Sequence, residues 1–367
     1  MARGSESASF PVAPRDFPDR AFQAVLKEPE NLRELVQVAA PEQALCLDCL
    51  NAKFRDPRFY MEDWRRLTAD LLFDVPIIGA SSESKARLAI VLVEQQTSSE
   101  DATVFRTSLH HNFAWAEDWK GWEERHERGE PLRLKPPIPI ILYTGSTPWN
   151  AARELRELFD GPEALLKQVE SWKPWIWEVC RHTPQELLNM SGEWLKTLAV
   201  VRAEKEAYSR FAETMGETLE RLEPLAKKAH VRWSGLVKFV MSWALNRRTR
   251  EERAGLAELA VKRQRGVDER NEVQAMSQTI AESLIEEGEI KGEIKGELKS
   301  KRSDLQRLLK RKFPNKFDES AAARIQSTEN TATLAEWMDA LLDAESWKDF
   351  KKLAGWPKSN GDNGHDG

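Results

Sequence analysis

The spacing of apolar residues changes along the chain, and each change predicts a different kind of element. Over residues 19–50, apolar side chains recur at helical intervals between prolines, which predicts two or three short helices. Two strand-like runs follow at 65–77 and 86–97, and the turn-rich segment 79–84 between them predicts a β-hairpin. The second run is apolar on both faces over 88–93, as expected for a central strand of a covered sheet.

After the hairpin, the pattern predicts one more helix and strand and then mostly helices. A helix is expected after Ser99, followed by a third strand at 136–149 that ends in a glycine-containing loop. Helical spacing dominates 151–270, and a long helix is predicted over 271–313. The fold class that follows is α/β with large α-helical additions in the C-terminal part.

The same pattern divides the chain into segments of different character. Both ends are polar and lack apolar anchors, which predicts disordered tails. In order, the predicted segments are a tail at 1–14, an α/β core at 15–165, a helical lobe at 166–270, a long charged helix at 271–313, a small helical module at 314–356 and a tail at 357–367.

The long helix contains the repeat GEIKGEIKGELK at 288–299, which has a period of four residues. In a helix this period places Glu, Ile, Lys and Gly on four separate faces, so a narrow apolar seam runs between acidic and basic columns. Such a seam resembles that of paired helices, and we predict helix pairing through residues 285–300. The pattern does not distinguish a homo-oligomer from pairing within one chain, and a solvated linker helix is the alternative.

Charge modifies this picture, because its distribution is uneven. The net charge of −5 argues against a simple polyanion-binding protein. However, residues 227–270 contain twelve Lys and Arg against five Asp and Glu, and residues 299–316 contain eight against one, a surplus of +7 in each. These two basic stretches are candidates for DNA contact, and the alternative is that they are solvated helix faces.

Composition also bounds the compartment. Three cysteines cannot form a disulfide framework and suit a reducing compartment, so a cytoplasmic protein is expected. No apolar run approaches about 18 residues, and the first ten residues lack the apolar region of a signal peptide. We therefore expect no membrane-spanning segment and no Sec-type export.

Several familiar sites are disfavoured by the motifs. Cys46 and Cys49 have the spacing of half a zinc site, but no second Cys or His pair lies at a usable distance. His110 and His111 diverge by about 100° on a helix and so do not grip one metal together. GxSxG, GxGxxG and phosphate-loop motifs are absent from the sequence, so no nucleotide cofactor is expected.

The hairpin carries the residues of greatest chemical interest. Asp70 interrupts an apolar run, and Glu94 and Gln96 end the next strand two residues apart, on the same face. A carboxylate among apolar residues is unfavourable unless it is paired or bound to a cation, and two facing carboxylates suit Mg²⁺. The alternative is that these carboxylates face solvent or form salt bridges.

These residues lie in segments that resemble the Rpn family of recombination-promoting nucleases and putative transposases. The resemblance rests on TADLLFDV around Asp70, IVLVEQQTS at the end of the next strand, the pair Phe105 and Arg106, and PPIPIILYTGSTPW. It covers roughly residues 15–165, and the tail AMSQTIAESLIEEG with its charged repeats is also similar. It implies a PD-(D/E)xK restriction-endonuclease-like core, with a mixed sheet flanked by helices, and a DNA endonuclease associated with recombination or mobile elements.

The resemblance also implies roles for particular residues. Asp70 and Glu94 look like the two metal carboxylates, and the main-chain carbonyl of Gln95 like a further ligand of Mg²⁺, for which Mn²⁺ is expected to substitute. Gln96 occupies the place of the superfamily lysine, so it can orient water by hydrogen bonds but carries no charge. The catalytic set is therefore Asp70, Glu94 and Gln96, and the partner is DNA.

Three further positions are weaker candidates. Arg106 is a candidate phosphate contact, and an ordinary surface arginine is the alternative. Asp19 resembles the Asp of the family's His-Asp motif, although Pro18 replaces the His, and Tyr143 is a candidate accessory residue with a structural role as its alternative. A catalytically decayed DNA-binding or oligomerising protein on the same fold is the competing interpretation of the whole chain.

Overall fold

The computed structural model describes residues 17–60, 66–79, 88–125, 131–169 and 172–356. The predicted tails at 1–14 and 357–367 and most of the predicted turn at 79–84 lie outside these residues. The chain forms two compact units: the N-terminal unit, Met1–Glu282, and the C-terminal unit, Ser283–Gly367.

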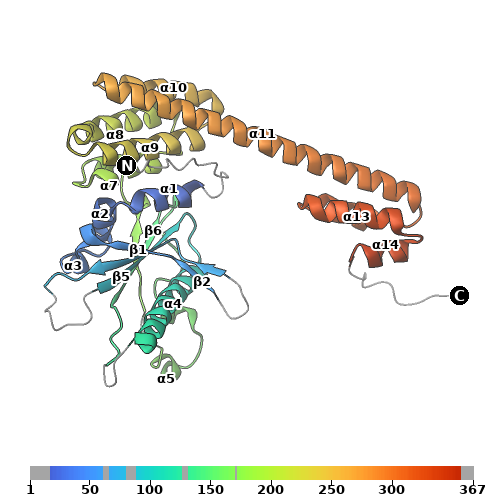
Figure 1. The fold of residues 1–367 in the computed structure, drawn as a ribbon, viewed down its shortest axis with the longest axis horizontal. Helices are drawn as coiled ribbons and strands as arrows, with labels where there is room; N and C mark the ends of the chain where they lie inside the picture. Colours follow the sequence, from blue (N-terminus) through green and yellow to red (C-terminus); the bar gives the residue numbers. More distant parts are fainter. Residues whose placement is uncertain (1–16, 61–65, 80–87, 126–130, 170–171, 357–367) are drawn as a thin grey trace. The chain divides into compact units, whose positions relative to one another are not determined.

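A five-stranded mixed sheet forms the centre of the N-terminal unit (Figure 1). Its strand order is β1-β4-β5-β6-β7, in which β4 is antiparallel to β1 and β5, whereas β5, β6 and β7 are parallel. The strands are β1 (Lys53–Arg55), β4 (Leu71–Pro76), β5 (Leu88–Gln96), β6 (Pro137–Tyr143) and β7 (Trp175–Glu178), and β2 (Arg58–Tyr60) pairs separately with β3 (Arg66–Thr68). The predicted mixed α/β class is confirmed.

The predicted hairpin is confirmed, with one correction. β4 and β5 pair in antiparallel register with Leu71 opposite Val93, and β5 is buried along almost its whole length. Asp70, however, lies directly before β4 and not within a strand, because the apolar run divides into β3 and β4. The prediction that 151–270 is mainly helical also misses β7, which is only four residues long.

Helix α4 (Asp101–Arg125) connects β5 to β6 and packs against both strands. Ile90 and Leu92 of β5 form an apolar cluster with Ala114 of α4, so the even-numbered positions of this strand face the helix. Glu94 and Gln96 continue the same series toward the end of β5. The face of the sheet that carries both polar residues is therefore the face that α4 covers.

Helices form the remainder of the N-terminal unit. The first group contacts the sheet or the helices beside it, and consists of α1 (Phe17–Leu26), α2 (Pro29–Ala39), α3 (Pro41–Ala44), η1 (Cys49–Asn51), η2 (Leu155–Leu158) and η3 (Val179–Arg181). The short helix α5 (Glu163–Leu166) follows η2. The second group packs mainly on itself, and consists of α6 (Pro184–Leu188), α7 (Glu193–Arg202), α8 (Tyr208–Lys228), α9 (His230–Arg247) and α10 (Arg250–Lys262). No helix among the described residues is long and apolar enough to cross a bilayer.

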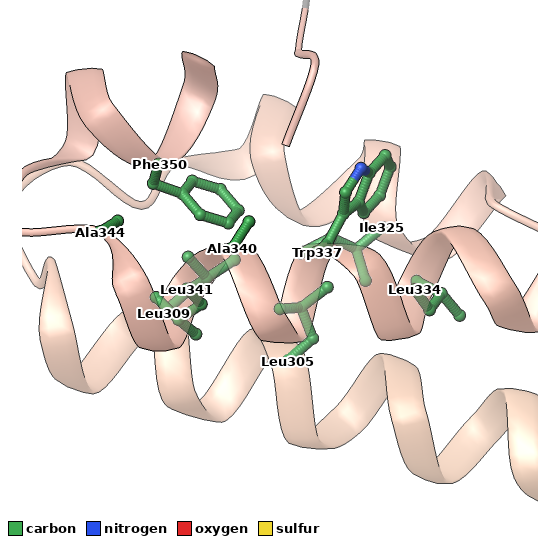
Figure 2. Close-up of a cluster of buried hydrophobic side chains, with 9 residues drawn as sticks. All are labelled: Leu305, Leu309, Ile325, Leu334, Trp337, Ala340, Leu341, Ala344 and Phe350. Atoms are coloured by element: carbon green, nitrogen blue, oxygen red, sulfur yellow. The ribbon is translucent and has the colours of Figure 1, made fainter. Parts of the chain in front are cut away.

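The boundary between the two units falls inside α11 (Val267–Lys312), where the sequence predicts a long helix over 271–313. The C-terminal unit combines the second part of α11 with α12 (Glu319–Ser327), α13 (Thr331–Asp343) and α14 (Trp347–Leu353). Figure 2 shows side chains of all four helices pointing into one core, including Leu305, Leu309, Ile325, Trp337 and Phe350. This unit therefore has a hydrophobic core of its own.

The middle of α11 is more open than its C-terminal end. Ile294 in the repeat is 48% exposed, whereas Leu298 packs against the core of the C-terminal unit. Gly292 and Gly296 have nothing within 4 Å of an added Cβ. Pairing of this helix with a second copy stays a prediction, and light scattering with and without residues 285–300 tests it.

Candidate functional site

Two acidic side chains meet where β5 ends. Because Leu71 lies opposite Val93, the next pair along the antiparallel strands is Asp70 and Glu94. Glu94 is only 5% exposed. Burial and the neighbouring Glu94 carboxylate raise the pKa of Asp70 to about 8. The two carboxylates are thus close enough, and shielded enough from water, for each to disfavour ionisation of the other.

The main chain of Gln95 completes this arrangement. Its N–H donates to Asp70 Oδ2 at 2.7 Å, a bond that favours the ionised form of Asp70. Along β5 the next carbonyl, that of Gln96, accepts from the N–H of Thr144 beside β6. Because successive residues of a strand bond to opposite sides, the Gln95 carbonyl faces the Asp70 side. Gln95 therefore offers a main-chain oxygen next to both carboxylates.

Helix α1 supplies two further polar groups at this point. Gln23 donates a side-chain hydrogen bond to Asp70, and the charge of Asp19 also raises the pKa of Asp70. Asp19 and Gln23 are four residues apart, so one face of the helix presents both. The structure therefore places the accessory candidate Asp19 near the carboxylates, although Pro18 is buried where the family motif has His.

Two side chains of helix α4 contact side chains at the end of β5. His110 Nδ1 lies 2.5 Å from Glu94 Oε1, and Arg106 Nη2 lies 3.5 Å from Gln96 Oε1. The helical partners are four residues apart and the strand partners two, so both pairs share one helix face and one sheet face. Arg106 also contacts Glu100 and is 42% exposed at its side chain, so it lies at the edge of the site.

These donors suit a hard cation with few protein ligands. Among the described residues, no three His, Cys, Asp or Glu side chains form a group that could hold a metal ion. Mg²⁺ commonly binds one or two carboxylates and keeps several waters. Asp70, Glu94 and the Gln95 carbonyl therefore fit Mg²⁺ by number and chemistry.

Tyr143 occupies a different environment. It lies beside Gln96 in the parallel register, but its ring is 2% exposed and packs edge-on against Trp149 at 5.2 Å. A Cβ added at Gly145 would come within 2.2 Å of the Tyr143 hydroxyl oxygen, so the loop needs glycine there. These surroundings favour a structural role for Tyr143 over an accessory role in the site.

The two basic stretches differ in how their charge is used. In the described part of the first stretch, six Arg and Lys side chains form ion pairs: Arg232 with Glu34, Arg247 with Glu204, Arg248 with Glu252, Lys262 with Glu258, Arg263 with Glu220 and Arg265 with Glu223. In the second stretch two form ion pairs, Lys301 with Glu297 and Arg307 with Asp304, whereas Lys310 and Arg311 are exposed near the end of α11. The second stretch is therefore the better candidate for binding an external polyanion.

The sequence reasoning missed two residues of this site. The sequence indicates only that His110 and His111 do not hold one metal together, yet His110 contacts Glu94 directly. Gln23 belongs to no motif that the sequence shows. The available signal was spacing, because Arg106 and His110 repeat at four residues on the helix that follows Glu94 and Gln96.

A mixed sheet with α4 on one face and two neighbouring carboxylates at the hairpin, one buried and one partly buried, defines an α/β protein with an acidic candidate site. The chain belongs to the family described as putative transposase, YhgA-like, whose model matches residues 17–230. This match confirms the resemblance seen in the sequence and includes every residue of the candidate site. Comparisons with curated proteins and with solved structures give no match. Membership associates the protein with mobile elements.

Proposed function

We propose that the protein is a Mg²⁺-dependent endonuclease that hydrolyses phosphodiester bonds of DNA during recombination or the movement of mobile elements. One observation carries the proposal, namely that Asp70 and Glu94 are held together under partial burial, so that the pKa of Asp70 rises to about 8. Such an arrangement is unfavourable by itself and becomes favourable when a divalent cation binds. Family membership supports the link to mobile DNA.

Each residue then has a limited task. Asp70, Glu94 and the Gln95 carbonyl hold the cation, which when bound polarises the scissile phosphate and lowers the pKa of water. Gln96 is uncharged and does not act as an acid or a base, so its role is to orient the attacking water by hydrogen bonds. Arg106, whose Nη2 lies 3.5 Å from Gln96 Oε1, is the residue to which we assign contact with a phosphate oxygen.

A plasmid-nicking assay with Mg²⁺ tests this function. Wild-type protein should convert supercoiled to open-circular DNA, and Asp70→Ala and Glu94→Ala should each abolish the conversion. Mn²⁺ should support cleavage, whereas EDTA should stop it. The competing interpretation, a decayed DNA-binding or oligomerising protein, predicts salt-dependent DNA binding without cleavage. If purified wild-type protein does not cut DNA with any divalent metal between pH 6 and about 9, the endonuclease proposal is wrong.

A further inference from the structure

The buried contact between His110 and Glu94 has a role that goes beyond packing. Both side chains are less than a tenth exposed, and Nδ1 lies 2.5 Å from Oε1, which is hydrogen-bonding distance and shorter than the separation of about 2.7–2.9 Å usual between a nitrogen donor and a carboxylate. α4 holds the imidazole in place, since Val104 and Ala114 of the same helix are completely buried. A rigid donor is therefore aimed at one oxygen of one candidate metal carboxylate.

Geometry determines what this donor does. With Oε1 engaged by the ring, the carboxylate of Glu94 cannot rotate freely about its terminal bond. Its other oxygen, Oε2, is then the one left to face Asp70. We propose that His110 is a positioning residue that fixes Glu94 for cation binding, with the Nδ1–H tautomer as donor. This inference rests on the proposed function and adds a residue to it.

The assignment explains a feature of the sequence. Adjacent histidines look interchangeable, but the structure separates them. His111 is 1% exposed and packs on Trp115 with ring centroids 3.9 Å apart, and burial lowers its pKa to about 4. His111 thus belongs to an aromatic cluster, whereas His110 faces the carboxylate. The two residues form a matched pair of the same type, on the same helix and with similar burial.

Metal binding, measured without DNA, gives the decisive readout. Binding of Mn²⁺ alone to the full chain is followed by isothermal titration for wild type, His110→Leu, His110→Asn and His111→Leu. Removing a partner that orients a metal ligand typically weakens metal affinity by about 10–100-fold. We expect His110→Leu to weaken Mn²⁺ binding by this factor. His110→Asn should restore most of the affinity, because its amide nitrogen takes the place of Nδ1. His111→Leu should bind Mn²⁺ like wild type.

Cleavage kinetics and the tautomer complete the test. His110→Leu should raise the Mn²⁺ concentration needed for half-maximal cleavage and leave KM for DNA unchanged. Because His110→Leu could fail to fold, ¹⁵N spectra of histidine-labelled wild type provide an independent measurement, and they should show a protonated Nδ1 at His110.

Two results overturn the inference in distinguishable ways. If wild type binds Mn²⁺ through Asp70 and Glu94, but His110→Leu binds it equally well or the Nδ1 of His110 carries no proton, the inference alone is wrong. If wild type binds no Mn²⁺ and cuts no DNA, the proposed function and the inference fall together.

Discussion

Asp70 Oδ2 accepts a 2.7 Å hydrogen bond from the main-chain N–H of Gln95, so the segment before β4 is fastened to the end of β5. Asp70→Asn keeps an acceptor for this bond and removes a partly buried acid whose pKa is raised to about 8, so that folding at neutral pH no longer requires this group to take up a proton. We expect it to abolish cleavage and to raise the Tm of the metal-free protein by about 2–4 °C, which corresponds to about 1 kcal/mol.

Differential scanning fluorimetry in EDTA measures this change. Asp74→Asn, in the adjoining strand β4, is the matched control, because Asp74 pairs with Lys135 at 2.8 Å. Its Tm should fall and its cleavage should persist. A lower Tm for Asp70→Asn would show that the two carboxylates do not oppose one another in the folded protein.

The second basic stretch should dominate binding to DNA. Replacing Lys310 and Arg311 together with alanine should reduce the slope of log Kd against log salt by about 2, since each phosphate contact contributes about 0.9. The control replaces Arg247 and Arg263, which form ion pairs with Glu204 and Glu220. Fluorescence anisotropy of a labelled duplex gives both slopes. Equal slopes for the control and the Lys310/Arg311 variant would contradict the assignment.

Glu34 links three helices of the N-terminal unit. Its carboxylate accepts from the main-chain N–H groups of Glu193 and Trp194 at the start of α7 and pairs with Arg232 of α9. Glu34→Ala leaves the partly buried Arg232 guanidinium and the N–H groups at the start of α7 without their carboxylate, and should lower the free energy of unfolding by about 3 kcal/mol. Urea denaturation followed by tryptophan fluorescence measures this.

A second substitution at the same place checks the interpretation. A Cβ at Gly192 would lie 2.5 Å from Glu34 Oε2. Gly192→Ala should therefore destabilise the protein as well, and in the double variant with Glu34→Ala it should add little. Additive effects would mean that the alanine side chain disturbs something other than Glu34.

Glu178 should make stability depend on pH. Although burial raises its pKa, hydrogen bonds from Arg153, the Trp149 N–H and Arg181 prevail and hold the pKa below its usual value. A carboxyl with a lowered folded pKa stabilises fully above the unfolded value of about 4.3 and loses this contribution as pH falls through the folded value.

The Tm difference between wild type and Glu178→Gln, measured from pH 7 down to about 3, should therefore shrink below about pH 4. Glu163, whose carboxylate pairs with Arg156 at 65% exposure, is the control. Glu163→Gln should change Tm by less than about 1 °C at every pH, as exposed pairs contribute little. If the Tm difference between wild type and Glu178→Gln stays constant with pH, the ion pairs of Glu178 are not its cause.

The core of the C-terminal unit should be sensitive to truncation independently of the sheet. Leu309 is completely buried among the helices of that unit, and Leu309→Ala should destabilise it by about 2–5 kcal/mol. Hydrogen–deuterium exchange of the full chain should then accelerate in α12–α14 and stay unchanged in β4–β6. Accelerated exchange in both units would show that they unfold together.

Much of the fold could be predicted because long apolar runs have clear periods. β5 begins with an uninterrupted apolar run over 88–93, β6 is apolar throughout, and the helical spacing after Ser99 identifies α4. β7 was missed because Trp175–Glu178 is too short to show alternation. The position of Asp70 before β4 depends on where β3 turns away to pair with β2, which no local pattern records.

Some residues of the candidate site could likewise be predicted from the sequence, and others could not. Asp70, Glu94 and Gln96 could be singled out because polar residues are conspicuous in apolar strands. His110 and Gln23 could not, because each belongs to an amphipathic helix whose rotation against the sheet sets its neighbours. The spacing of residues within one helix predicts which face of the helix a side chain lies on. Which residue of another element it contacts depends on how the two elements pack.

The pairing of Arg106 with Gln96 and of His110 with Glu94 also limits how this family can change its length. A substitution at any of the four positions disturbs one contact. Inserting or deleting one residue between Arg106 and His110 turns one side chain by about 100° around the helix and separates it from the strand. Relatives that keep this site should therefore vary in composition along the segment while its length stays constant.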